Sequence, residues 1–231
     1  MTITLALIVA AVSIGSIHSL APDHWVPFAA LARAERWSAR RTSAVTALCG
    51  LGHVTASVAL GLLGVVFGRE LLETFGERLE SVAGLLLIGF GIAYGFWGVQ
   101  RTLRGRAHAH AHAHGLAHAH RQYSDSAKGS DPGSDPFHRP LTAWTLFLLF
   151  SADPCVAVIP LMVASAPLGW ASTLGVVAAY ELATIVTMVA LVLPTRAAIG
   201  RVHGAWADQW GDAVAGGVVA FVGVVVMSFG I

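Results

Sequence analysis

The side chains best suited to metal chemistry lie in an apolar stretch near the start of the chain. The segment His18-Ser-Leu-Ala-Pro-Asp23-His24 contains two imidazoles and one carboxylate, a ligand set that suits Ni, Co, Zn or Fe. A charged Asp inside a membrane segment costs about 2.5–3.5 kcal/mol on insertion scales, so an idle one is not expected. The alternative is that Asp23 and His24 mark the cytoplasmic end of a short first span, with Trp25 as an interfacial anchor.

Pro22 is the residue that would bring these side chains together. On a regular helix, His18 and His24 would point about 120° apart. Pro22 has no N–H, and its ring clashes with the carbonyl four residues back, which is that of His18. It also disfavours helical angles in the residue before it. The sequence therefore predicts a helix break at residues 19–22, where His18, Asp23 and His24 converge beside a freed backbone carbonyl.

A third histidine occurs in the next apolar stretch, Gly50-Leu-Gly52-His53-Val-Thr. A histidine well inside a hydrophobic span is costly unless it has a partner. The two glycines allow another helix to approach closely. We interpret His53 as a further metal ligand, and the alternative is a histidine hydrogen-bonded between helices.

A second group of polar residues occurs in the second half of the chain, in Ser-Ala-Asp153-Pro154-Cys155 and at Glu181. Pro154 should free the carbonyl of Phe150 and open its helix. Asp153 and Cys155 could then face the ligands of the first half. Glu181 lies in an apolar run, where it could be a ligand or a proton acceptor, or a carboxyl neutralised by burial.

The middle of the chain contains a histidine-rich segment. Six histidines occur within 13 residues, at His108, His110, His112, His114, His118 and His120. Such a composition indicates metal binding, and flexible alternation cannot fix one geometry, so several metals should bind. The segment would act as a buffer or sensor that loads or gates the membrane site, or it is a solvated low-complexity linker.

The elements that position these residues follow from the composition. Of 231 residues, 55% are hydrophobic and 12% are charged, against about 25% charged in an ordinary soluble domain. A soluble chain of this kind would expose apolar patches over most of its surface. A soluble enzyme and a nucleic-acid-binding protein are therefore excluded, and we expect an integral protein of the lipid bilayer.

Six apolar runs are long enough to be transmembrane helices, and in lipid only helices satisfy the backbone in runs of this length. We predict an all-α protein with spans at about 3–31, 43–67, 79–99, 141–166, 170–194 and 211–230. The N-terminal run lacks a basic region before it, so we expect it to be a retained span.

The charges predict the orientation of these spans. Twelve of the 14 Lys and Arg residues lie in the segments after the first, third and fifth spans. By the positive-inside rule these segments are cytoplasmic, and both termini lie outside. The histidine-rich segment would then be cytoplasmic, in the inner membrane if the protein is bacterial.

The chain also matches itself at one constant offset, here called the repeat offset. Ser19 and Pro22 fall on Ser151 and Pro154, and the rows Gly84/Gly91/Gly98 and Gly216/Gly223/Gly230 have helix-packing spacing. We predict two inverted three-helix repeats, 1–100 and 141–231, with the first and fourth helices broken, joined by the His-rich segment 101–140. Inverted repeats with broken helices are a transporter architecture. The glycine rows could pack within one chain or between two, as in a homo-oligomer.

The motif H-x4-D-H followed by Gly-His in the next span resembles the nickel/cobalt transporter superfamily. The six-span layout is similar to the branch that includes nickel/cobalt efflux proteins and membrane urease-accessory proteins. The resemblance implies that His18, Asp23, His24 and His53 recognise a divalent nickel or cobalt ion. The chain differs from the longer uptake members by its six spans, by a motif in the first span and by Pro22.

These observations predict a transporter of divalent transition metals, Ni²⁺ or Co²⁺ first and Zn²⁺ next, and not an enzyme with a cofactor. Export fits a His-rich cytoplasmic segment, and proton coupling fits ligands that must lose protons to bind. No P-loop is present to support ATP hydrolysis. Alternatives are nickel uptake, metal delivery as an accessory protein, and thiol–disulfide electron transfer through Cys49 and Cys155, although the repeat position of Cys155 is held by Asp23.

Overall fold

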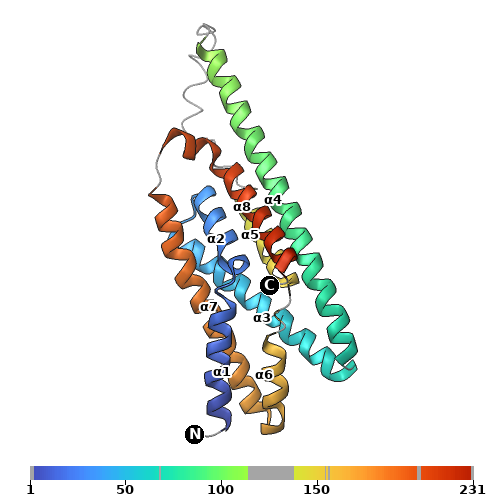
Figure 1. Ribbon diagram of the computed structural model, residues 1–231. Coiled ribbons are helices and arrows are strands. Elements are labelled where there is room, and N and C mark those ends of the chain that lie inside the picture. Colours follow the sequence, from blue (N-terminus) through green and yellow to red (C-terminus); the bar gives the residue numbers. More distant parts are fainter. Residues whose placement is uncertain are drawn as a thin grey trace.

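The computed structural model describes residues 3–67, 69–113, 138–153, 155, 157–201 and 204–229. All regular secondary structure in these ranges is helical, as the sequence predicts, and the helices form one elongated bundle (Figure 1). Within the same ranges, four helices contain segments long and apolar enough to cross a membrane. They are α3 (Ala39–Phe67), α4 (Arg69–Ala113), α7 (Trp170–Gly200) and α8 (Ala205–Phe229).

The first apolar run is divided into α1 (Ile3–His18) and α2 (Pro22–Ala34), which are bent by 54° and count as a fifth span if taken together. Pro22 is the first residue of α2, and Ala21 before it is extended, with φ −57° and ψ 134°, as a residue before proline prefers. The carbonyl of His18 is not free, because it accepts the N–H of Ala21 at 3.1 Å. The prediction of a freed His18 carbonyl is therefore wrong, since a tight turn closes the break.

The run predicted as the fourth span is divided as well. It consists of α5 (His138–Ala152), α6 (Val158–Ser165) and a single 3₁₀ turn, η2 (Ala166–Leu168). Each piece is shorter than the roughly 20 residues that cross a bilayer. By length, the described residues thus contain four or five spans where the sequence predicts six. Pro154, between the two helices, lies outside the described residues.

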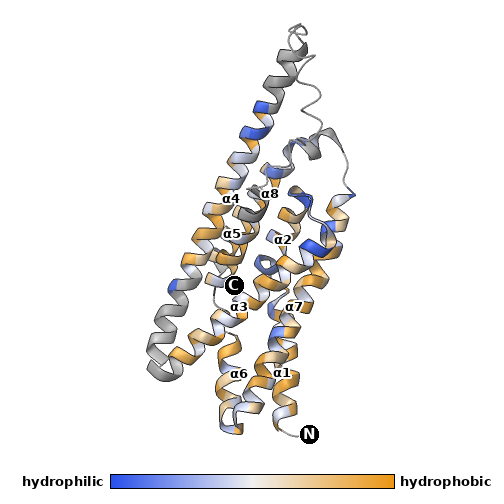
Figure 2. Ribbon diagram, turned by 180° about the vertical axis from the view of Figure 1, so that it is seen from behind, coloured by the Kyte–Doolittle hydropathy of each residue, from blue (hydrophilic) through white to orange (hydrophobic). Residues whose placement is uncertain are grey.

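Most helices pack against partners from the other half of the chain. The most extensive contact joins α4 and α8, while α1 lies along α7 and α3 lies between α5 and α7. Two hydrophobic clusters result: one surrounds Phe28 and Met188, and the other surrounds Val158 and Tyr180. Hydrophilic residues gather at the end of the bundle opposite the N-terminus (Figure 2).

The glycine rows pack α4 against α8 within this one chain. A Cβ atom on Gly91 would meet the backbone of Gly216 and Ala220, and one on Gly223 would lie 3.1 Å from the carbonyl oxygen of Gly84. Because no side chain separates the two backbones, the helices approach as closely as small residues permit. The described part of these rows is therefore occupied by an intrachain contact.

The segment between the two halves begins as helix. Helix α4 continues through residues 101–113, so the first part of the predicted 101–140 loop is helical. His108, His110 and His112 belong to this helical extension, but their side chains lie outside the description. His114, His118 and His120 lie outside the described residues altogether.

Candidate metal centre

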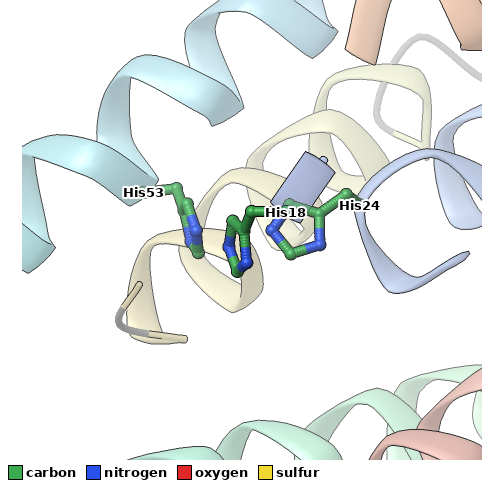
Figure 3. Close-up of side chains that lie close together, drawn as sticks. All are labelled: His18, His24 and His53. Carbon is green, nitrogen blue, oxygen red and sulfur yellow. The ribbon is translucent and has the colours of Figure 1, made fainter. Parts of the chain in front are cut away.

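Three histidines meet where the first span breaks (Figure 3). His18 is the last residue of α1, His24 lies in the first turn of α2, and His53 comes from the middle of α3. Their ring centroids are 4.3 Å apart for His18–His24, 5.2 Å for His24–His53 and 6.0 Å for His18–His53. One nitrogen from each ring can be chosen so that all three lie within 4.8 Å of one another.

This spacing is slightly wider than that of a loaded site. Imidazole nitrogens lie about 2.0–2.1 Å from a bound divalent ion, so two of them are at most about 4.2 Å apart and about 3.4 Å apart in a tetrahedral site. The three rings must therefore close by roughly 1 Å to hold an ion together. Rotation of the side chains about their staggered torsions can supply a change of this size without moving a helix.

The strongest feature of the cluster is its unsatisfied nitrogens. His24 and His53 are each only 1% exposed, and the Nε2 atoms of His18, His24 and His53 are buried with no hydrogen-bond partner among the described residues. A buried polar atom without a partner costs about 1–3 kcal/mol, so three such atoms in one cluster of rings require an explanation. A cation bound between the rings would accept one lone pair from each of them.

The ring of His53 is oriented by the second half of the chain. Its Nδ1 lies 3.1 Å from the carbonyl oxygen of Phe150. Because a carbonyl only accepts, Nδ1 must carry the proton, which leaves a lone pair on Nε2, the tautomer that binds a metal. Phe150 lies in the last turn of α5, where carbonyls lack helical donors, and Pro154 four residues later has no N–H to offer.

Asp23 lies behind His24 and outside the three-histidine group. Its Oδ2 is 2.8 Å from Nδ1 of His24, at an angle that leaves this nitrogen without a well-directed hydrogen bond. The Asp23 side chain is almost fully buried, and its Oδ1 also has no partner in the described structure. A carboxylate in this place orients a ligating imidazole and raises its basicity.

Phe150 forms an apolar wall on the centre; the sequence indicates its freed carbonyl but not the role of its ring. Its ring centroid lies 4.8 Å from that of His53 and 5.4 Å from that of His24. At the repeat offset Phe150 is the counterpart of His18, and this signal could have found it. The second half thus supplies an aromatic face and a carbonyl acceptor to a centre whose imidazoles all come from the first half.

Asp153 lies near the centre without joining the histidines. It lines a small cavity of about 30 Å³ together with Asp23, Phe28 and Phe150. A space of this size holds one or two water molecules. Asp23 therefore lies between the histidine cluster and the cavity that Asp153 also lines.

Cys155 takes part in a polar network that reaches the backbone of His53. Its Sγ lies 2.7 Å from the hydroxyl of Tyr180, and its backbone N–H donates to Oγ of Ser57 at 2.6 Å. The Ser57 hydroxyl donates in turn to the carbonyl of His53, one turn earlier on α3, at 2.7 Å. Ser57 and Tyr180 were not identified from the sequence, although a serine one turn from His53 was a usable signal.

The two cysteines and Glu181 lie outside the three-histidine group. Cys49 and Cys155 are both buried free thiols, but they belong to different hydrophobic clusters. Glu181 follows Tyr180 on α7 and is half-buried, and its Oε1 is enclosed without a hydrogen-bond partner in the described ranges.

Comparisons with protein-family models, with curated proteins and with solved structures find no match for this chain.

Proposed function

We propose that this protein transports divalent transition-metal ions across the membrane and that His18, His24 and His53 bind the ion on its way. The observation that carries this proposal is the convergence of three imidazoles, each with a buried and unpartnered Nε2, at the break of the first span. Irregular backbone inside an apolar bundle is tolerated where it lines a binding site or cavity. Broken helices near the middle of a bundle are where transporters bind their ions.

The ligand number favours a transport site over a structural one. A structural zinc site is closed by four protein ligands, whereas three ligands leave a position open for water or exchange. Three imidazoles suit nickel, cobalt, copper or zinc better than magnesium or calcium, which prefer oxygen. Among these we propose Ni²⁺ and Co²⁺ as the transported ions, with Zn²⁺ as a competitor.

Helix contacts support a six-span arrangement of two inverted repeats, in which α5 and α6 together form the fourth span. A Cβ atom on Gly15 of α1 would contact Thr184 of α7, and one on Gly52 of α3 would contact Phe147 of α5. At the repeat offset, Gly15 is equivalent to Phe147 and Gly52 is equivalent to Thr184. The contact is thus repeated with the halves exchanged, as a twofold relation between them requires.

The same exchange relates the contacts between α4 and α8. Gly91 lies against Gly216, and Gly84 lies against Gly223. At the repeat offset, Gly84 is equivalent to Gly216 and Gly91 is equivalent to Gly223. Rocking one half against the other about such an axis would open the histidine cluster alternately to the two sides.

The distribution of basic residues along the chain favours export of the metal, which we couple to an exchange of protons. The positive-inside rule places the six histidines of residues 108–120 on the cytoplasmic side, where they would concentrate metal for pickup. Imidazoles bind metal only when neutral, so protons that enter from the other side would promote release. Asp153 directly follows α5, and Glu181 lies on α7. We assign these two carboxyl groups to the path of the protons.

A metal-delivery accessory protein is the alternative that shares the same centre. It would bind metal at the three histidines without carrying it across the bilayer. A thiol–disulfide relay is less favoured, because Cys49 and Cys155 lie in separate hydrophobic clusters.

Flux into liposomes tests the proposal. The purified full chain would be reconstituted with a metal-sensitive dye inside, and Ni, Co, Zn, Fe and Mn would be supplied outside with a pH gradient of either sign. We expect flux of Ni²⁺ and Co²⁺ that depends on the proton gradient and is lost in His18→Ala. Metal binding without flux in folded protein would establish the accessory role, and flux unchanged in His18→Ala would refute the site.

A further inference from the structure

An arginine-lined cavity lies between α2 and α7, away from the histidines. It has a volume of about 430 Å³, and the remaining lining residues are small: Ala32, Ala197 and Gly200. Its charged lining consists of Arg33, Arg36, Arg196 and Arg201. None of the described residues that line it is acidic. Four basic residues around one space favour an anionic ligand.

A second, apolar cavity lies next to the first, and Arg33 lines both. This groove has a volume of about 230 Å³ and lies between α2, α7 and α8. Its walls include Trp25, Ala30, Val214 and Trp206, and Arg33 is the only charged residue among its described lining. The arginine cavity and the apolar groove are therefore neighbours, with Arg33 in the lining of both.

We propose that the arginine cavity and the apolar groove together bind one anionic phospholipid. Its phosphate would lie among the four arginines, and an acyl chain would lie in the groove. Guanidinium groups recognise phosphate oxygens through paired, charge-assisted hydrogen bonds. A soluble phosphate would use only the arginine cavity and leave the groove empty, so an apolar groove directly beside the arginine cavity favours a lipid.

The location of the feature fits a lipid headgroup. It lies towards the ends of α2 and α7 at the hydrophilic end of the bundle, opposite the N-terminus (Figure 2). Trp206 is 66% exposed at the rim of the groove, and tryptophan concentrates at the membrane–water interface. The charge rule assigns this end to the cytoplasm, where basic pockets between helices bind anionic headgroups.

One arginine of the cavity also holds the backbone in place. Arg196 donates a hydrogen bond to the carbonyl of Trp37, just after the turn that joins α2 to α3. Arg36 in that turn has a positive φ of 52°, a conformation that costs energy unless the surroundings hold it. A phosphate that contacts the side chains of Arg36 and Arg196 would connect this turn to the end of α7.

The lipid would lie on the back of the helix that carries His24. The buried face of α2 includes Asp23, His24 and Phe28, while Trp25, Ala30 and Arg33 of the same helix line the groove. A bound lipid would therefore restrain α2, the helix that carries Asp23 and His24. The lipid site itself rests on no assumption about transport.

Native mass spectrometry of the purified chain tests this proposal. Phosphatidylglycerol, phosphatidylcholine and inorganic phosphate would each be titrated separately. We expect phosphatidylglycerol to bind at least about tenfold more tightly than phosphatidylcholine, and phosphate alone to bind weakly. The double variant Arg33→Gln/Arg201→Gln should weaken phosphatidylglycerol binding about 30-fold, given the typical contribution of each basic residue near anionic lipid.

Two further variants separate the possible outcomes. The control Arg40→Gln/Arg104→Gln removes the same charge from exposed arginines that line neither cavity, and its phosphatidylglycerol affinity should change less than threefold. Val214→Trp would fill the groove and keep every arginine, so it should weaken phospholipid binding and leave phosphate binding unchanged. Equal binding of the two lipids, equal losses in both double variants, or phosphate binding as tight as lipid would overturn the proposal.

Discussion

The substitution His53→Asn separates metal binding from folding at the three-histidine centre. The amide nitrogen of asparagine can replace Nδ1 as the donor to the Phe150 carbonyl, which His53 contacts at 3.1 Å. Asparagine has no counterpart of Nε2, so one of the three ligands is lost. The substitution therefore removes a metal ligand and keeps the contact that joins α3 to α5.

The expected effects on metal affinity and on the stability of the metal-free protein differ. Four-ligand zinc sites bind with about 10–16 kcal/mol, or roughly 3 kcal/mol per ligand, so metal affinity should fall about 100-fold or more. The stability of the metal-free protein should not fall in parallel, because the unpartnered Nε2 of His53 costs the folded state about 1–3 kcal/mol. A merely structural histidine would show the reverse pattern.

Calorimetric titration with Ni²⁺ and Co²⁺, together with thermal unfolding in detergent, measures both quantities. Val54→Ala is the matched control, since Val54 is the next residue on α3 and is also 1% exposed, but it has no ligand atom. We expect the control to keep its metal affinity and to unfold at a lower temperature. Unchanged affinity in His53→Asn, or an equal loss in Val54→Ala, would refute the assignment of the centre.

Three further outcomes are expected. Asp23→Asn should weaken metal affinity about 10–100-fold, because the carboxylate 2.8 Å from Nδ1 of His24 supports that ligand; calorimetry with an unchanged affinity would exclude this positioning role. Metal binding should weaken as the pH falls, since protons compete with the metal for the imidazole nitrogens; an affinity that stays constant down to acidic pH, measured by calorimetric titration at several pH values, would contradict imidazole ligation. Gly91→Leu should prevent folding, because a Cβ atom at this position meets the backbone of Gly216. The control Gly89→Leu lies on the same helix but faces open space, so this variant should fold, as judged by size-exclusion chromatography. Similar behaviour of the two variants would contradict the α4–α8 packing.

The break in the first span and the all-helical class could be predicted from the sequence because both are local properties. A proline without an N–H ends helical bonding wherever it occurs, and the length of an apolar run sets whether a helix can span a bilayer. The division of α1 from α2 next to Pro22 follows from these two facts. The turn that occupies the His18 carbonyl does not follow from them, because a four-residue turn is only one of several ways to close a break.

Only the packing of distant helices decided which polar residues meet. The register of α3 against the break brings His53 to His18 and His24, and the end of α5 supplies the Phe150 carbonyl that sets the tautomer of His53. Packing also directs Cys155 to Tyr180 instead of to the histidines. The amino-acid sequence determines where the polar groups that are costly to bury lie along each span. Whether these groups become ligands depends on the atoms that other helices place next to them, because a buried polar atom needs a partner in three dimensions.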